Sequence, residues 1–280
     1  MALAVALVVV IITLLSGYFF WAHTWWFPID ISKHGGAIDR QFTLTLIITG
    51  IIFVLAQLAL AYAVWRYRDR GDGRKARYSH GNNKLEATWT IAATVLFIGL
   101  TLMGYHIWAG IHFVGAAPGA MRVEVWGQQF AWYFRYPGPD GQFGPVHIGD
   151  KYDPATGKYI DDNKVDDATG NYLGLDRDHD AASKDDIVTA TLAVPVNQQV
   201  ELILRSKDVT HSFFVRELRL KQDLVPGMEI PIHFTATKTG RFEIACAELC
   251  GLGHYKMRAF FEVMTEPDYQ KWLQNMAAAQ

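Results

Sequence analysis

The chain reads Cys246-Ala247-Glu248-Leu249-Cys250-Gly251-Leu252-Gly253-His254-Tyr255-Lys256-Met257 near its C-terminal end, and this stretch holds both cysteines of the 280-residue sequence. A histidine and a methionine accompany them in the same short loop. Thiolate, imidazole and thioether groups are soft or borderline ligands, and as a set they suit copper. Two cysteines are too few for a disulfide framework, so they supply one bridge or one metal site. The stretch therefore predicts a soft-metal loop.

Short segments of alternating polarity surround this loop. Residues 240–245 lead into it and residues 258–263 leave it, and the same alternation marks residues 121–126, 187–194, 200–204 and 229–234. A period of two, with Pro or Gly between the runs, predicts an antiparallel sandwich or barrel. Residues 266–278 predict a terminal helix with Thr265 as its N-cap.

Three apolar runs without charged residues precede this domain. They extend from Ala2 to Trp21, from Phe42 to Trp65 and from Ala87 to about Phe113. Each exceeds the roughly 18–20 residues that a helix needs to cross a bilayer. No Lys or Arg precedes the first run, and aromatic residues follow it where a small-residue cleavage site is expected, which favours a retained helix over a secretory signal. We expect three membrane helices, with two plus a signal segment as the alternative.

The loop between the second and third runs is basic. Its cationic residues are Arg66, Arg68, Arg70, Arg74, Lys75, Arg77 and Lys84, against Asp69, Asp72 and Glu86. The positive-inside rule places this loop in the cytoplasm, so the copper-type loop lies on the other face. We expect a multi-pass protein of the bacterial inner membrane with a periplasmic domain. The net charge of −2 gives no reason to expect a nucleic-acid partner.

Residues 138–186 interrupt the strand pattern with an acidic insertion. It contains twelve Asp against five Lys or Arg between Asp140 and Asp186. Such a composition does not build a core of its own, so we expect a solvated insertion, with an acidic docking surface or a weak calcium loop as alternatives. The calcium ligands would be Asp176, Asp178, Asp180, Asp185 and Asp186. The expected domains are 1–41, 42–118 and 119–280.

The cysteine loop has several chemical interpretations. Cys246 and Cys250 can form a disulfide, one cysteine can bind a single copper ion while the other stays idle, or the loop can hold structural zinc, for which methionine is a poor ligand. Two thiolates can instead bridge two copper ions, each of which also takes one imidazole.

The bridged arrangement needs a second histidine besides His254. His211 follows an apolar strand and is the best candidate. His233 is its competitor, but it alternates with apolar residues and is expected on the surface of a strand.

Several stretches of the sequence resemble one protein family. Asp208-Val209-Thr210-His211-Ser212, Val225-Pro226-Gly227 and the cysteine loop resemble cytochrome c oxidase subunit II. The resemblance extends to Gly127-Gln128-Gln129 and to Glu86-Ala87-Thr88-Trp89-Thr90, and it covers runs two and three and most of residues 121–274. It implies N-terminal transmembrane helices followed by a cupredoxin-like Greek-key β-barrel with a binuclear copper centre, CuA.

The resemblance also implies roles for the loop residues. Cys246 and Cys250 would bridge the two copper ions, His211 and His254 would each complete one of them, and Met257 would be a weak axial ligand.

Two glutamates gain roles by the same resemblance. Glu248 would ligate copper through its backbone carbonyl and direct its side chain toward a Mg²⁺ at the boundary with the catalytic subunit. Glu86 resembles a glutamate near a proton-uptake path, although the helix macrodipole alone also favours an acid at that helix start.

One departure from the family concerns electron input. The family usually has Gly-His-Gln-Trp-x-Trp where this chain has Gly127-Gln128-Gln129-Phe130-Ala131-Trp132. Phe130 therefore replaces the tryptophan linked with electron uptake from cytochrome c, and Trp132 and Trp126 remain as candidates beside it. A second departure is the additional first helix.

The resemblance implies an electron-transfer subunit of a terminal respiratory oxidase, a proton-translocating oxidoreductase. It would accept electrons from cytochrome c and pass them to the heme–copper catalytic subunit I, which holds the hemes and reduces O₂ to water. Further oxidase subunits and membrane lipid are the other expected partners. Alternatives are the CuA subunit of a nitric oxide reductase, a copper-free quinol oxidase homologue and a copper-handling module.

Overall fold

The computed structural model describes residues 1–22, 27–73, 75, 78, 80–148, 150–161 and 171–279. It divides into two compact units, residues 1–28 with 36–109, and residues 29–35 with 110–280. Residues 23–26 after the first run, Arg74 and Arg77 of the basic loop and residues 162–170 of the insertion lie outside the described residues.

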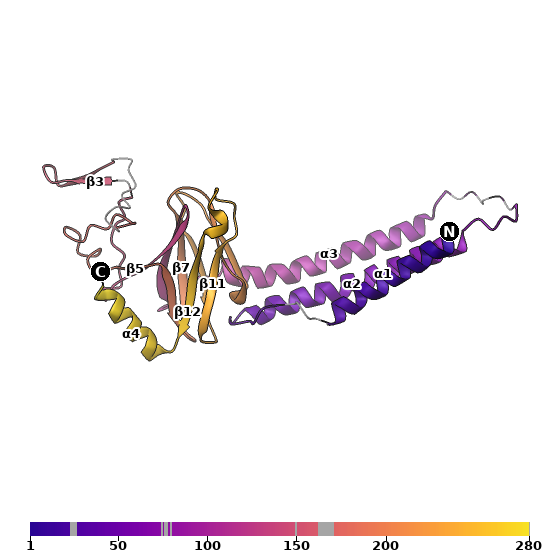
Figure 1. Cartoon of the computed structure of the whole chain (residues 1–280), viewed down its shortest axis with the longest axis horizontal. Helices are drawn as coiled ribbons and strands as arrows, with labels where there is room; N and C mark the ends of the chain where they lie inside the picture. The colour runs from indigo at the N-terminus through magenta and orange to yellow at the C-terminus, as the bar shows by residue number, and fades with distance from the viewer. Residues whose placement is uncertain are drawn as a thin grey trace. The chain divides into compact units, whose positions relative to one another are not determined.

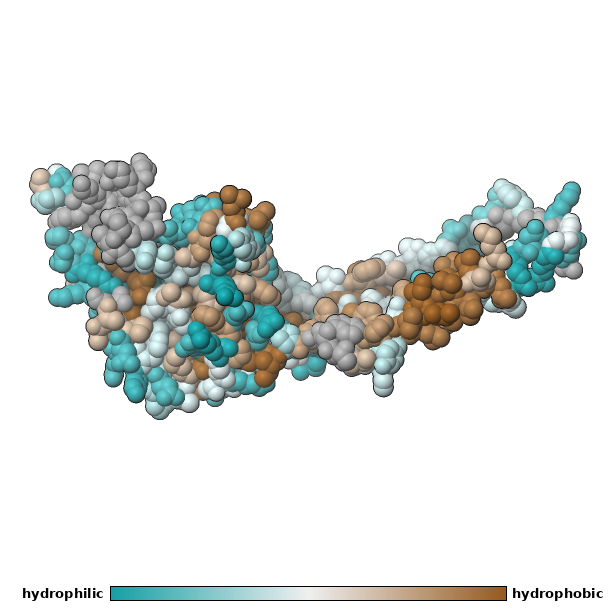
Figure 2. Space-filling model, viewed as in Figure 1, coloured by the Kyte–Doolittle hydropathy of each residue, from teal (hydrophilic) through white to brown (hydrophobic). Residues whose placement is uncertain are grey.

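The first unit consists of the three expected helices, α1 (Ala2–Ala22), α2 (Gly35–Arg66) and α3 (Asn83–His112) (Figure 1). All three are long and apolar enough to cross a membrane. α2 and α3 begin before the predicted Phe42 and Ala87, because a helix continues through polar residues that a charge-free run excludes. Figure 2 shows a hydrophobic surface on this unit, as lipid exposure requires. The side-chain amide of Gln41 on α2 donates to the carbonyl of Leu100 on α3 (3.1 Å).

The second unit is built from two five-stranded sheets. The first has the order β10-β7-β1-β2-β5 and contains β1 (Met121–Gln128), β2 (Ala131–Tyr136), β5 (Ile187–Thr189), β7 (Gln199–Ser206) and β10 (Ile230–Thr235). The second has the order β6-β12-β11-β8-β9 and contains β6 (Thr191–Pro195), β8 (His211–Val215), β9 (Leu220–Leu224), β11 (Gly240–Cys246) and β12 (Arg258–Met264). A hairpin of β3 (Asp150–Asp153) and β4 (Lys158–Asp161), the short helices η1 (Arg216–Leu218) and η2 (His254–Lys256), and α4 (Glu266–Ala277) complete it.

The two sheets pack into the expected β-sandwich. Phe234 of β10 and Phe261 of β12 are buried and meet edge to face, with ring centroids 5.7 Å apart. Most strand pairs are antiparallel as predicted, but β1 pairs with β7 and β6 pairs with β12 in parallel. Thr265 caps α4 by accepting from the Asp268 N–H, which confirms the predicted cap.

The predicted strand 187–194 is in fact two strands in different sheets. The strand breaks at Ala190. The part before the break, β5, pairs with β2 in the first sheet, and the part after the break, β6, pairs with β12 in the second sheet. The Thr189 hydroxyl donates to the carbonyl of Thr191 (2.6 Å) and lies 3.3 Å from its nitrogen, so a local side-chain bond replaces the sheet bonds there. The alternating pattern continues through the break, so it does not reveal the change of sheet.

The segment before α2 adds a strap to the sandwich. Ile31 is fully buried, and its N–H donates to the carbonyl of Glu217 (3.1 Å). The N–H of Thr237 donates to the Ile31 carbonyl (2.7 Å), and the N–H of Lys33 donates to the carbonyl of Thr235 (3.0 Å). Residues 29–35 therefore extend the backbone pairing beyond the end of β10.

The acidic insertion packs against the sandwich through apolar side chains. Leu173 and Leu175 are buried against Trp126 of β1, and Val146 and Ile148 lie against the same cluster. The solvated-loop interpretation is therefore wrong for this part of the insertion, because its few apolar residues share a core with the sandwich.

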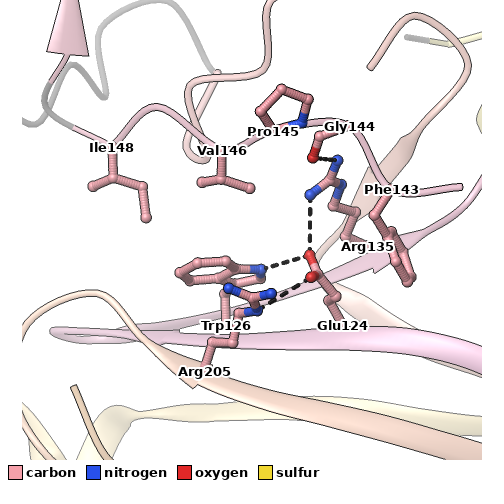
Figure 3. A pocket seen from close by; sticks show the side chains of 9 residues that line it. All are labelled: Glu124, Trp126, Arg135, Phe143, Gly144, Pro145, Val146, Ile148 and Arg205. Carbon is pink, nitrogen blue, oxygen red and sulfur yellow. Dashed lines mark hydrogen bonds and ion pairs between the residues drawn. The ribbon is translucent and has the colours of Figure 1, made fainter. Parts of the chain in front are cut away.

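A buried ion-pair network also anchors the insertion. Arg135 of β2 is completely buried, and its guanidinium donates to Glu124 (3.0 Å), to Asp186 (Nε, 3.0 Å) and to the Gly144 carbonyl (2.5 Å). Figure 3 shows Glu124 and Arg135 at a pocket of about 410 Å³, where Glu124 also accepts from the indole N–H of Trp126 (3.1 Å). Burial raises the pKa of Asp186, and the bonds from Arg135 oppose that shift.

The calcium alternative gains no support from the part of the chain that the structure describes. No group of three or more carboxylates gathers its oxygens there as a cation site requires, and Asp186 is committed to Arg135.

Candidate metal centre

The cysteine loop is closed at its base by the backbone. β11 ends at Cys246, whose N–H donates to the carbonyl of Met257 (3.1 Å). The N–H of Ala247 donates to the carbonyl of Ser212 on β8 (3.0 Å), which places the start of the loop beside His211. The two ends of the loop and the first residue of β8 therefore lie together, although they are far apart in sequence.

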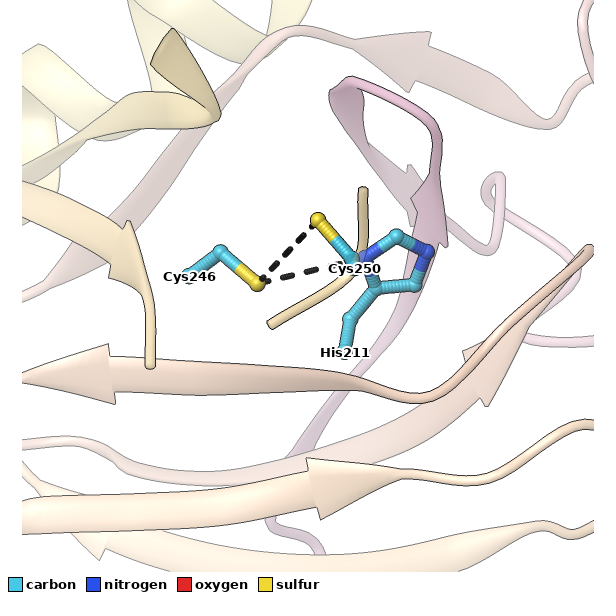
Figure 4. Close-up of side chains that lie close together, drawn as sticks. All are labelled: His211, Cys246 and Cys250. Atoms are coloured by element: carbon cyan, nitrogen blue, oxygen red, sulfur yellow. Dashed lines mark hydrogen bonds between the residues drawn. The ribbon is translucent and has the colours of Figure 1, made fainter. Parts of the chain in front are cut away.

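The expected ligand atoms converge at this place. The Sγ atoms of Cys246 and Cys250 are 3.9 Å apart, and both residues are buried free thiols, since a disulfide would require about 2.0 Å. Nδ1 of His211 lies 3.9 Å from Cys246 Sγ, and Nδ1 of His254 lies 3.7 Å from Cys250 Sγ. Figure 4 shows the two sulfurs and the His211 ring turned toward one another.

Two further atoms complete the group. Met257 Sδ lies 3.7 Å from Cys250 Sγ, and the carbonyl oxygen of Glu248 lies 3.2 Å from Cys246 Sγ. With a metal–sulfur bond near the zinc value of about 2.3 Å, an ion can contact both sulfurs at once. Thiolate, imidazole and thioether donors in one buried place fit copper. Among the described residues, His211, Cys246 and Cys250 are the one group of His, Cys, Asp or Glu whose ligand atoms lie close enough to hold a metal ion.

The acid–base state of the metal-free site is set by burial. Burial raises the pKa of Cys250 to about 11, and the neighbouring Cys246 adds to the shift. Burial also raises the pKa of Asp208, but hydrogen bonds from the Gln129 N–H, from His211 and from the Val209 N–H outweigh it and leave this pKa below its usual range. Asp208 is therefore ionised near neutral pH, beside His211, one of the expected copper ligands.

Several residues around the ligands were not assigned roles from the sequence. The carboxylate of Asp208 is hydrogen-bonded to Nε2 of His211 (2.8 Å). The two residues lie three positions apart in the stretch Asp208-Val209-Thr210-His211, so the sequence contains a signal for this contact. Gly127 allows close packing, because a Cβ there would lie 2.8 Å from Cδ2 of His211. Gln129 donates to Asp208 and to the Cys250 carbonyl, and no pattern in the sequence marks that pairing.

The aromatic candidates for electron input divide into exposed and buried ones. Phe130 is 39 % exposed, whereas Trp132 is 2 % and Trp126 is 6 % exposed. The Trp132 ring meets the His211 ring edge to face at 6.1 Å. Phe130 lies against the cysteine loop, since a Cβ on Gly253 would lie 2.4 Å from its ring.

The remaining candidates lie away from the centre. Nδ1 of His233 accepts from the side-chain amide of Gln199 (3.2 Å), and its Nε2 donates to the Val114 carbonyl (2.7 Å), so His233 is not near the ligands. Glu86 is exposed in the first turn of α3, whose start is capped by the Asn82 side chain.

Known proteins share both units. Two family models match, the transmembrane domain of cytochrome c oxidase subunit II over residues 32–107 and its periplasmic domain over residues 157–264. An alternative cytochrome c oxidase subunit 2 from Bradyrhizobium diazoefficiens is 36% identical over 274 residues, which cover 97% of this chain and 91% of the relative.

The chain belongs to the cytochrome c oxidase subunit II family.

One further relative agrees with this assignment. A cytochrome c oxidase subunit 2 from Cereibacter sphaeroides is 32% identical over 232 residues, covering 82% of this chain and 72% of the relative. The crystal structure of the periplasmic domain of subunit II of cytochrome oxidase from Bradyrhizobium japonicum is 24% identical, with a TM-score of 0.40, and covers 59% of this chain and 99% of that one.

As a subunit II, the chain is an electron-transfer subunit of a heme–copper oxidase, an oxidoreductase. It is a membrane protein whose copper domain lies in the periplasm. The family, the fold class and the membrane location predicted from the sequence are confirmed.

Proposed function

We propose that the chain holds two copper ions, bridged by Cys246 and Cys250, with one imidazole for each. The observation that carries this proposal is that each sulfur faces a different imidazole, Cys246 facing His211 at 3.9 Å and Cys250 facing His254 at 3.7 Å. A mononuclear copper site needs only one of the two thiolates, and the thioether of Met257 is a poor ligand for zinc. Both alternatives would therefore leave one of these residues without a role.

The two halves of the centre differ in their weaker ligands. Met257 Sδ stands on the Cys250 side, and the Glu248 carbonyl stands on the Cys246 side. Bound copper would supply one-electron redox chemistry at this place. The chain's own residues hold the donors in fixed positions, since the loop is closed at its base and Asp208 orients His211. Fixed ligands change little between oxidation states, which favours fast transfer.

The electron donor is proposed to be cytochrome c or a similar periplasmic protein, and the acceptor the heme–copper catalytic subunit, where hemes reduce O₂. Further oxidase subunits and lipid would surround the helices. Phe130 is proposed as the donor contact, because Trp132 and Trp126 are too buried to meet a docked protein. Trp132 would act further inside, packed against His211.

The surface around the ligands supports apolar contact with the donor. Leu252 is 97 %, Leu249 78 % and Tyr255 78 % exposed, and all three lie on the loop that carries the ligands. Large apolar side chains on a soluble surface mark interaction sites. The charged residues beside these side chains are Lys207 and Asp208, which precede His211, and Glu248 and Lys256, which lie in the cysteine loop. Their two positive and two negative charges balance, so the docking of the donor would depend little on salt.

Two glutamates are proposed for roles outside the copper group. The Glu248 carbonyl faces Cys246 while its side chain is exposed, which would let the carboxylate reach a Mg²⁺ at the boundary with the catalytic subunit. Glu86 is exposed at the start of α3, the cytoplasmic end by the positive-inside rule, which suits a group near proton uptake.

Metal analysis and electron paramagnetic resonance of the purified full-length chain test the proposal. We expect two copper ions per chain and an unpaired electron shared between them. His211→Ala and Cys250→Ser should each remove that signal, whereas His179→Ala, in the insertion, should keep it. A spectrum of isolated mononuclear copper in the wild-type chain would refute the binuclear centre.

A further inference from the structure

The turn that joins β1 to β2 contributes no ligand, yet it contacts both segments that do. One segment runs from Asp208 to His211, and the other is the cysteine loop. Gly127, near the end of β1 just before the turn, packs against the His211 ring, and its carbonyl accepts from the Lys207 N–H (3.0 Å). Phe130, at its end, lies on the backbone of the cysteine loop at Gly253.

Gln129, in the middle of this turn, forms a hydrogen bond with each segment. Its backbone N–H donates to Oδ2 of Asp208 (2.8 Å), while Oδ1 of the same carboxylate holds Nε2 of His211 (2.8 Å). Its side-chain Nε2 donates to the carbonyl oxygen of Cys250 (2.5 Å). A short path of hydrogen bonds therefore runs from a ligand on β8, through Gln129, to a ligand on the loop.

The loop is shaped to admit this side chain. Gly251 has φ of +135°, a backbone conformation that other residues rarely adopt, and a Cβ on it would lie 2.8 Å from Nε2 of Gln129. The same Cβ would lie 3.2 Å from the Phe130 ring. Glycine at this position thus lets the turn approach the loop directly after Cys250.

We propose that Gln129 is a positioning residue that fixes the His211 segment and the Cys250 segment relative to each other. This inference rests on the proposed binuclear centre. Residues that form hydrogen bonds with metal ligands, without contacting the metal, set the orientation of those ligands. Their loss typically costs about 10–100-fold in metal affinity or activity. Gln129 itself is exposed, so water can replace part of its bonding. We therefore expect an effect near the lower end of that range, with the fold retained.

The neighbouring residue provides a matched control. Gln128 has the same side chain, but its Oε1 accepts from Nζ of Lys207 (2.6 Å), on the side where Lys207 also donates to the Tyr172 carbonyl of the insertion (2.6 Å). Replacing Gln128 changes the same turn without touching the Cys250 carbonyl.

The test compares Gln129→Leu, Gln129→Glu and Gln128→Leu in the purified oxidase complex. Leucine removes the amide donor at similar size, and glutamate sets an acceptor against the Cys250 carbonyl. Two quantities are measured, the rate of copper loss to a chelator and the hyperfine pattern of the copper electron paramagnetic resonance signal. We expect both Gln129 variants to lose copper about tenfold faster and to show an altered pattern. Gln128→Leu should stay within about twofold of the wild type in release rate and keep its spectrum.

Two results would overturn the inference. One is a wild-type release rate and spectrum in Gln129→Leu. The other is a lower unfolding temperature of the copper-free full-length chain with an unchanged spectrum of the loaded protein, because that describes a turn residue that serves the fold alone. The wild-type spectrum separates this question from the proposed function: if it lacks the two-copper signal, the binuclear centre fails first, whatever the variants do.

Discussion

Asp208 Oδ1 lies 2.8 Å from Nε2 of His211, so the other ring nitrogen, Nδ1, faces Cys246 Sγ at 3.9 Å. A carboxylate that accepts from one nitrogen of an imidazole fixes both the tautomer and the orientation of the ring. The N–H groups of Gln129 and Val209 hold the same carboxylate in place. The ligand face of His211 is thus oriented by the protein itself.

Replacing this carboxylate should weaken the metal site. In Asp208→Asn the orienting charge is lost, and we expect copper affinity to fall about tenfold or more. Competition with a chelator on the full-length chain measures the change. Asp178→Asn, an exposed aspartate of the insertion, should leave the affinity unchanged. Equal affinities for the two variants would contradict the role given to Asp208.

Copper uptake should release protons and depend on pH. Burial and the neighbouring Cys246 raise the pKa of Cys250 to about 11, so the metal-free site carries a thiol at neutral pH. Copper binds the thiolate form of cysteine, and the fraction of thiolate in the metal-free site decreases as the pH is lowered. Apparent affinity should therefore fall as the pH is lowered through the whole range below that pKa. Titration in weak buffer measures the protons released, and Cys250→Ser should release fewer. An affinity independent of pH would count against this account.

Gly253→Ala should disturb the donor contact without straining the backbone. Gly253 has φ of −91°, which alanine adopts readily, but the new Cβ would lie 2.4 Å from the Phe130 ring. The ring has to move, and we expect kcat/KM for the donor to fall. Adding Phe130→Ala to Gly253→Ala removes the clash, so the double variant should respond no more than Phe130→Ala alone. Gly115→Ala, where no atom lies within 4 Å, is the control.

Leu252→Ser should weaken donor docking through lost apolar contact. Burying a leucine contributes about 1.5–3 kcal/mol, so a partial contact predicts a KM for the donor raised by roughly tenfold with kcat retained. Steady-state kinetics at two ionic strengths measures both parameters. Wild-type docking should depend weakly on salt, and a steep loss of rate with salt would instead favour recognition by charges.

Arg135→Met should destabilise the domain while leaving the copper site formed. The substitution leaves Asp186 buried without its cation, while Glu124 keeps its ion pair with Arg205 (3.2 Å), and we expect a cost of about 3 kcal/mol. Chemical unfolding of the full-length chain measures this loss. The same change at Arg258, whose pair with Glu243 is exposed, should cost about 1 kcal/mol or less. Similar losses at both positions would show that burial is not the cause.

The chemistry of the loop was accessible from sequence because each ligand type has a narrow set of uses. The strands on either side were accessible because alternation survives in β11 and β12, which are exposed on one face. β2 could not be predicted, because its sequence Ala-Trp-Tyr-Phe-Arg-Tyr does not alternate between apolar and polar residues. Its arginine, Arg135, would be expected on the surface but is buried. The partners of Arg135 stand 11 and 51 residues away, so no local pattern indicates that its charge is neutralised inside the fold. Gln129 was missed for the same reason, because its partner Cys250 is 121 residues distant.

The strap at residues 29–35 has a practical consequence for anyone who wishes to study the periplasmic domain alone. A fragment that starts after α3 would lack Ile31, and the backbone groups of Thr235 and Thr237 that pair with the strap would be left open. An open strand edge next to an empty apolar slot is a template for self-association. Such a fragment should therefore aggregate unless residues 29–35 are supplied as a separate peptide or fused back to the domain.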